Sequence, residues 1–124
     1  DMELIFVYNA DSSPFAQIKD SIHKSISPKT YGCRLCALTF GALREKQQWA
    51  EFIKTLGIET KFLHKDEFVS TYSAQKFDNF PAVFLKKENG LKLLISKEEI
   101  EKQNTLDDLI DLVASKTTQV LKEN

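Results

Sequence analysis

The sequence predicts an α/β protein in which helices cover a mixed, five-stranded sheet. Short apolar runs typical of strands alternate with segments whose apolar residues recur every three or four positions, as on one face of a helix. Near the C-terminal end, two strand-like runs flank Asn89-Gly90, a strong hairpin signal, so those two strands must be antiparallel. The expected order is β-α-β-α-β-α-β-β-α, with right-handed crossovers between the parallel strands.

The first strand and the first helix have clear sequence signals. Residues 4–8 form a continuous apolar run rich in β-branched and aromatic side chains, which is typical of a strand buried on both faces. Ser13 is a favourable N-cap residue, and Pro14 suits the first helical position because its φ angle is already restricted. We expect this helix to stop at Ser27 and Pro28. Its apolar stripe consists of Phe15, Ile18, Ile22 and Ile26.

The middle of the chain predicts a strand, a helix and another strand. Residues 35–40 are mostly apolar and predict the second strand. A helical stripe predicts a helix from about residue 43 to residue 56, closed by Gly57. Residues 58–64 alternate with a period of two, which predicts a more exposed third strand that ends at His64.

The remaining elements are a helix, a hairpin and two further helices. Asp66 is expected to cap the third helix. Residues 83–87 and 91–95 predict the fourth and fifth strands, on either side of the hairpin turn. Ser96 and Thr105 are suitable N-caps for a short helix and for a longer C-terminal helix.

Composition indicates one globular domain. The chain has 124 residues, of which 42% are hydrophobic, so we expect a single domain over residues 2–118 and a frayed tail over residues 119–124. The net charge of -1 argues against a nucleic-acid partner. No apolar run approaches the roughly 20 residues that span a bilayer, and no signal peptide is recognisable, so we expect no membrane contact and a cytoplasmic location.

The chain has two cysteines, Cys33 and Cys36, in a Cys-x-x-Cys arrangement. This spacing suits a reversible dithiol, with a protein thiol or a peptide as its partner. Cys33 follows a loop glycine and is expected to be the more exposed, attacking thiol, with Cys36 as the resolving thiol. We therefore predict Cys33 and Cys36 as catalytic residues of a thiol–disulfide redox or redox-sensing protein.

Two other interpretations of the cysteines stay open at this point. Cys36 could be a small buried residue within an apolar strand, without chemistry of its own. The pair could also supply half of a tetrahedral zinc site, although such a site needs four ligands. The two histidines, His23 and His64, do not converge with the cysteines in the predicted topology. We expect no bound metal and no cofactor.

The run Phe80-Pro81-Ala82-Val83-Phe84-Leu85, followed by a hairpin and a C-terminal helix, resembles the cis-proline stretch of thioredoxin-fold proteins. The resemblance covers nearly the whole chain in element order. It implies a thioredoxin-like three-layer sandwich and a cis peptide bond before Pro81. It also implies a redox Cys-x-x-Cys at the start of a helix that follows a strand, facing the cis-proline.

The positions of the cysteines depart from that family pattern. The stretch Ser13-Pro14-Phe15-Ala16 is similar to the Cys-Pro-aromatic-Cys of glutaredoxins, but both cysteines are replaced. Cys33 and Cys36 lie instead at the start of the predicted second strand, and a five-residue strand separates its two ends by roughly 16 Å. On this prediction the cysteines do not reach Pro81.

The C-terminal strand ends suggest a second candidate site. In parallel α/β sheets ligands bind at this edge, so Ser13, His64, Phe80 and Pro81 are predicted substrate-binding residues. Helix capping by Ser13 and a solvated strand end at His64 explain the same residue types without a ligand. An alternative function follows, namely a non-catalytic thioredoxin-fold module that holds a peptide or partner at the Pro81 edge.

Overall fold

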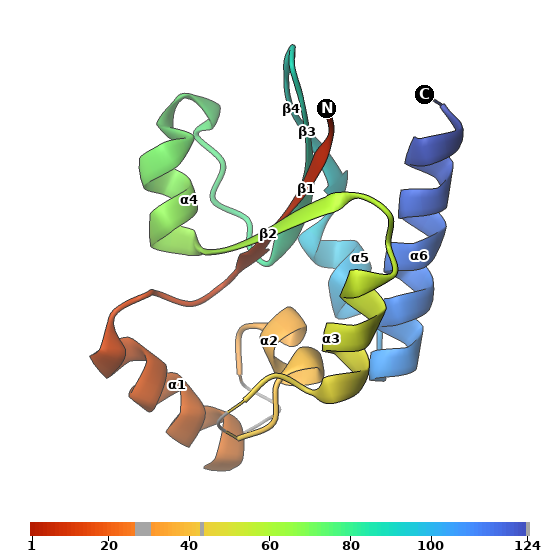
Figure 1. Cartoon of the computed structure of the whole chain (residues 1–124). Coiled ribbons are helices and arrows are strands. Elements are labelled where there is room, and N and C mark those ends of the chain that lie inside the picture. The colour runs from red at the N-terminus through yellow and green to blue at the C-terminus, as the bar shows by residue number, and fades with distance from the viewer. Residues whose placement is uncertain (27–30, 43, 124) are drawn as a thin grey trace.

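Strand β1 (Glu3–Tyr8) lies inside a mixed sheet, as its apolar run predicts (Figure 1). In the computed structural model, which describes residues 1–26, 31–42 and 44–123, the described residues form four strands in the order β2-β1-β3-β4. Strand β2 (Glu59–His64) is parallel to β1, β3 (Ala82–Lys87) is antiparallel to β1, and β4 (Gly90–Ile95) completes the predicted hairpin. The predicted five-stranded sheet is therefore wrong.

The missing strand is a helix. Residues 35–40 were expected to be extended, but α2 spans Arg34–Thr39. The Cys33 side chain caps it by accepting a hydrogen bond from the Cys36 N–H at 3.2 Å, and the Cys33 carbonyl accepts one from the Ala37 N–H at 2.9 Å. Leu35, Cys36 and Thr39 are all buried. A short run that is buried on several sides has no polar face, so apolar composition alone cannot separate helix from strand.

The other predicted helices are present with adjusted bounds. Ser96 and Thr105 act as N-caps, because their hydroxyl oxygens accept hydrogen bonds from the N–H groups of Glu99 and Asp108, both at 3.1 Å. Leu43, the expected start of the second helix, lies outside the described residues, as do Ser27 and Pro28. The observed helices are α1 (Pro14–Ile26), α3 (Gln47–Lys54), α4 (Lys65–Thr71), α5 (Lys97–Glu101) and α6 (Leu106–Lys122), with a 3-10 turn over Ser73–Gln75.

The sheet separates two layers of helices, and β1 contributes to the core on both of its faces. Leu4, Phe6 and Tyr8 pack in one cluster with residues of α2, α3, α5 and α6. Ile5 and Val7 face the other side, where the second cluster is completed by aromatic residues from α4 and β3. All five side chains are buried, which accounts for the unbroken apolar run in the sequence.

Helix α1 belongs to neither layer. It lies beyond the C-terminal end of β1, beside α2, and none of its residues is buried (Figure 1). Its apolar stripe is open to solvent, since the exposed fractions of Phe15, Ile18, Ile22 and Ile26 are 78%, 62%, 56% and 76%. The amphipathic pattern correctly predicted a helix, but this helix does not cover the sheet.

The C-terminal helix is longer than expected. Residues 119–124 were predicted to fray, yet α6 continues to Lys122, and Val120 is only 6% exposed within the main core cluster. Asn124 lies outside the described residues. Buried Thr117 and Val120 extend the inner face begun by Leu109 and Val113, so packing holds the last turns in place.

Replacing Val120 with Ala tests this packing. The substitution removes two buried methyl groups, so the free energy of unfolding should fall by about 2 kcal/mol in urea titrations. Leu121, which is 41% exposed, provides the matched control, and its replacement with Ala should change the value by less than about 0.5 kcal/mol. Equal effects of the two substitutions would contradict the packed C-terminal helix.

Candidate functional site

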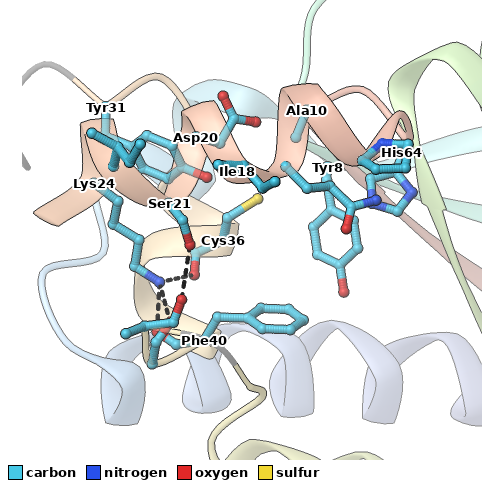
Figure 2. A pocket seen from close by; sticks show the side chains of 15 residues that line it. Tyr8, Ala10, Ile18, Asp20, Ser21, Lys24, Tyr31, Cys36, Phe40 and His64 are labelled. Carbon is cyan, nitrogen blue, oxygen red and sulfur yellow. Dashed lines mark hydrogen bonds between the residues drawn. The ribbon is translucent and has the colours of Figure 1, made fainter.

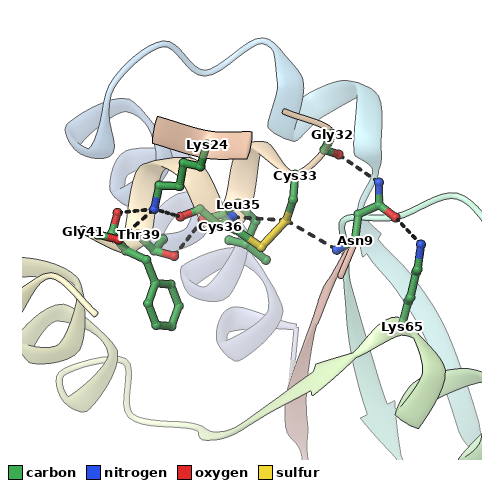
Figure 3. The surroundings of a disulfide bond; sticks show 10 residues. Asn9, Lys24, Gly32, Cys33, Leu35, Cys36, Thr39, Gly41 and Lys65 are labelled. Carbon is green, nitrogen blue, oxygen red and sulfur yellow. Dashed lines mark hydrogen bonds between the residues drawn. A yellow bond between two sulfur atoms is a disulfide. The ribbon is translucent and has the colours of Figure 1, made fainter. Parts of the chain in front are cut away.

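The two cysteines are joined by a disulfide bond at the start of α2 (Figure 3). Cys33 is the N-cap residue, and Cys36 follows in the first turn of the helix, so their Cα atoms are 5.3 Å apart. The first helical turn brings the two sulfur atoms together.

The disulfide lies at the C-terminal end of β1. The Asn9 N–H, which follows the last residue of this strand, donates to Cys33 Sγ at 3.4 Å across 24 positions of sequence. The Cys36 N–H donates to the same sulfur atom at 3.2 Å. The expected separation between the cysteines and this edge of the sheet is therefore wrong, and its cause is the incorrect assignment of residues 35–40 to a strand.

The two cysteines differ in exposure, in the opposite sense to our prediction. Cys33 is fully buried, whereas Cys36 is 9% exposed. Cys33 is buried because it packs against the end of β1. The glycine before it does not make the cysteine accessible. The expectation that Cys33 is the more exposed thiol is wrong for this disulfide-bonded state.

Asn9 connects the three segments that meet at the disulfide. Its side-chain Nδ2 donates to the Gly32 carbonyl at 2.9 Å, immediately before Cys33. Its Oδ1 accepts a hydrogen bond from Lys65 Nζ, at the start of α4, at 3.4 Å (Figure 3). A single side chain thus holds the approach to α2 and the start of α4 against the end of β1.

A pocket of about 620 Å³ opens between α1, α2 and the ends of β1 and β2 (Figure 2). Cys36 reaches this pocket, and Figure 2 shows its side chain pointing from α2 toward α1. Apolar surface dominates the lining, with Ile18 and Ile22 from α1 facing Tyr8 and Phe40 from the body of the protein. Asp20, Ser21, Lys24 and His64 are among the polar groups at its wall.

Lys24 fastens α1 to the end of α2. Its ammonium group donates to the carbonyls of Phe40 at 2.7 Å, Gly41 at 2.9 Å and Cys36 at 3.5 Å. Partial burial, and to a smaller extent the charge of Lys46, lowers the pKa of Lys24. Phe40 and Gly41 directly follow the last residue of α2, so the ammonium group lies at the negative end of this helix.

Two phenol groups in the pocket wall stay uncharged at neutral pH. Burial, together with the nearby Asp20 carboxylate, raises the pKa of Tyr31 to about 12. Burial is also the main reason that the pKa of Tyr8 is raised, with a smaller effect from Glu45. Neither phenol therefore adds a negative charge to the pocket.

His64 lies at the pocket, at the C-terminal end of β2 and the N-cap of α4. Its ring is 5.6 Å from that of Tyr8, and its Nδ1 is 2.9 Å from Glu67 Oε1. The Glu67 carboxylate also accepts a hydrogen bond from the His64 N–H at 2.7 Å. The structure thus brings His64 and Cys36 to one pocket, and the role of His64 in substrate binding stays a prediction.

The other predicted binding residues do not line this pocket. Ser13 caps α1, since its Oγ accepts a hydrogen bond from the Ala16 N–H at 3.1 Å. Phe80 is buried in the α4-side core, against Phe68 and Phe77. Pro81 is buried directly before β3, and the Phe80–Pro81 peptide bond is cis. For these three residues, too, substrate binding remains a prediction.

Asp66 does not cap α4, contrary to expectation. Its carboxylate instead accepts hydrogen bonds from the N–H of Ser12 at 2.9 Å and from the hydroxyl group of Ser12. The hydroxyl bond is the largest of the effects that lower the pKa of Asp66. The contact ties the segment before α1 to the start of α4, and so helps to place the pocket wall.

No group of three or more His, Cys, Asp and Glu side chains that could hold a metal ion occurs among residues 1–26, 31–42 and 44–123. Over the same residues, no helix combines the length and apolar composition that a bilayer span requires. The comparisons with protein-family models, curated proteins and solved structures found no match to this chain.

Sequence reasoning missed three residues that shape the site, namely Asn9, Lys24 and Tyr8. The sequence analysis assigns no role to Asn9 and places Tyr8 only within the first strand. Lys24 lies off the apolar stripe of its helix, in the last turn, where a basic residue is common. Two of its partners, Cys36 and Phe40, belong to the segment that was predicted as a strand, so the sequence analysis did not reveal the contact.

Replacing Lys24 with Met should release the end of α2. The loss of the charged donor leaves backbone carbonyls without their partner, so the free energy of unfolding should fall by about 1–2 kcal/mol. Lys19, an exposed residue of the same helix, provides the control, and its replacement with Met should cost less than about 0.5 kcal/mol. Urea titration of both variants measures the free energy of unfolding. Equal losses in the two variants would argue against the hydrogen bonds between Lys24 and the carbonyls after α2.

The hydrogen bond to Asp66 can be tested by titration. Because the bond favours the carboxylate, its stabilising effect is present at neutral pH and is lost as the pH falls through the lowered pKa. Carbon NMR of the Asp66 carboxyl group should show a higher titration midpoint after Ser12 is replaced with Ala. The control is Ser21→Ala. The Ser21 hydroxyl donates to the Ala42 carbonyl and not to Asp66, so its loss should leave the Asp66 midpoint unchanged. An unchanged midpoint in Ser12→Ala would rule out the assigned bond.

Proposed function

We propose that this protein is a thiol–disulfide redox protein whose Cys33–Cys36 pair cycles between a disulfide and a dithiol. The observation that carries the proposal is the position of the pair. The two sulfur atoms lie at bonding distance in the first turn of α2, and one of the cysteines reaches an open pocket. A disulfide with no route to a substrate could serve only a structural role, so access to the pocket favours chemistry.

The surroundings of Cys33 suit a sulfur atom that becomes a thiolate. Two backbone N–H groups, from Asn9 and Cys36, donate to it in the oxidised state. The same donors stabilise a negative charge on the sulfur when the disulfide is reduced, because hydrogen bonds to an ionised acceptor are stronger than those to a neutral one. A stabilised thiolate is a good leaving group in thiol–disulfide exchange.

A relationship to thioredoxin-fold proteins is part of this proposal. It is supported by the placement of the cysteines at the start of a helix, beside the C-terminal end of β1. Pro81 provides further support, because the next residue, Ala82, pairs with Val7 near the same end of this strand. Helix α1 separates β1 from the cysteines in sequence, so the pair follows a helix and not directly the strand.

The proposal predicts fast, reversible exchange in the folded protein. The oxidised protein and an oxidised synthetic peptide covering residues 31–38 should be treated with the same thiol at neutral pH, quenched with acid, and weighed by mass spectrometry. The folded protein should exchange at least about tenfold faster, because its leaving thiolate is stabilised by two N–H donors. Reoxidation should restore the mass that is lower by two hydrogens.

The variants Cys33→Ser and Cys36→Ser serve as controls, and neither should complete the cycle. Circular dichroism should be recorded on both, so that loss of exchange is not confused with loss of the fold. A disulfide that is reduced only when the protein unfolds would contradict the proposal and indicate a structural bond.

A further inference from the structure

We infer that substrates react at Cys36, entering beneath α1, and that Cys33 is the leaving group; the substrate class is a thiol with an apolar group next to its sulfur. The inference rests on the proposed function and deepens it. It reverses the roles that the sequence suggested for the two cysteines.

Access to the two sulfur atoms is unequal. Cys33 is fully buried, packs in the core cluster, and does not line the pocket. Cys36 is 9% exposed and forms part of the pocket wall (Figure 2). A thiolate must approach a disulfide sulfur from the side opposite the bond that breaks. Of the two cysteines, only Cys36 borders the pocket from which a thiolate could approach.

The hydrogen bonds assign the leaving group independently of exposure. Cys33 Sγ accepts N–H bonds from Asn9 at 3.4 Å and from Cys36 at 3.2 Å. Charge that develops on this sulfur during exchange meets two donors already in place. Attack at Cys36 therefore places the departing electron pair where the protein stabilises it, because the rate of exchange rises with the stability of the leaving thiolate.

The exchange balances without a further reactant. A substrate thiolate forms a bond to Cys36 Sγ, the bond between the two cysteines breaks, and its electron pair stays on Cys33 as a thiolate. A second thiolate of the substrate then attacks the substrate sulfur of this mixed disulfide and releases Cys36 as a thiolate. The substrate dithiol loses two electrons and becomes a disulfide, the protein pair gains both, and protons are exchanged with water.

The pocket identifies the chemical class of the substrate. Ile18 and Ile22 from α1 and Phe40 beyond α2 provide apolar surface around Cys36. Tyr31 stays neutral at neutral pH, and the Lys24 ammonium group is already bound to backbone carbonyls. Asp20, Ser21 and His64 also line the pocket, but most of its surface is apolar, so apolar contact is the main basis on which the group beside the attacking sulfur is selected. The exposed stripe on α1 continues this surface outward from Ile18 and Ile22.

The position of attack can be read directly, because trypsin separates the two cysteines. Cleavage after Lys29, Arg34 and Arg44 places Cys33 in peptide 30–34 and Cys36 in peptide 35–44. The oxidised protein is treated briefly with phenylmethanethiol, acidified, blocked with N-ethylmaleimide and digested. The phenylmethyl adduct should occur on peptide 35–44 and the maleimide on peptide 30–34, at least about tenfold over the reverse arrangement.

Selectivity is tested with a second thiol. The rate of disulfide exchange with phenylmethanethiol is divided by the rate with 2-mercaptoethanol, both for the protein and for the oxidised peptide 31–38. The ratio for the protein divided by the ratio for the peptide measures the selectivity of the folded site. The protein should favour phenylmethanethiol by about tenfold on this scale, because the pocket buries the phenyl ring of this thiol. Ile18→Ala should lower the preference about threefold, whereas Ile26→Ala, on the same helix but outside the pocket, should leave it unchanged.

The outcomes separate this inference from the proposed function. Fast exchange with the adduct on Cys33, or with no preference for the aromatic thiol, would overturn the inference and leave the redox function standing. Equal effects of Ile18→Ala and Ile26→Ala would likewise overturn the assigned pocket. Exchange no faster than in the oxidised peptide would instead remove the proposed function itself.

Discussion

The hydrogen bond from the Asn9 N–H to Cys33 Sγ, 3.4 Å long, is the contact on which the arrangement of the site depends. It joins the end of the central strand to the start of α2 across 24 positions, and the Asn9 side chain adds bonds to Gly32 and Lys65. With Cys33 at this position, α2 begins beside the end of β1, and Cys36 borders the pocket next to α1. Strand, disulfide and pocket thus share one anchor.

The parts of the fold with distinct chemical signals were predictable, and the part without one was not. The buried run of β1, the hairpin at Asn89-Gly90 and the caps at Ser96 and Thr105 each have a local cause that can be recognised in sequence. Residues 35–40 have none, since a short apolar run satisfies either a buried strand or a buried helix. Cys33 caps the helix that forms there, and its sulfur accepts a hydrogen bond from Asn9, which lies 24 positions earlier and is not part of any local pattern.

Helix α1 shows the corresponding limit for function. The spacing of Phe15, Ile18, Ile22 and Ile26 indicates which side of the helix is apolar, but it cannot indicate whether that side is covered. Here the side chains of the stripe are largely exposed, and polar contacts hold the helix instead, from Lys24 to the Phe40 carbonyl and from the Ser21 hydroxyl to the Ala42 carbonyl. Both partners lie after α2, and Phe40 belonged to the segment wrongly predicted as a strand. The Cys-x-x-Cys was recognisable from the sequence, but its pocket was not.

The placement of α1 also explains how the two sulfur atoms of the disulfide come to have different surroundings. A reactive pair needs one sulfur atom that substrates can reach and one that stabilises negative charge. If α2 followed β1 directly, no helix would lie over the cysteines. The intervening α1 instead forms one wall of the pocket beside Cys36, while the return of the chain to Asn9 buries Cys33 beneath two N–H donors. The insertion of α1 between β1 and the cysteines thus accounts for the difference in exposure between Cys33 and Cys36.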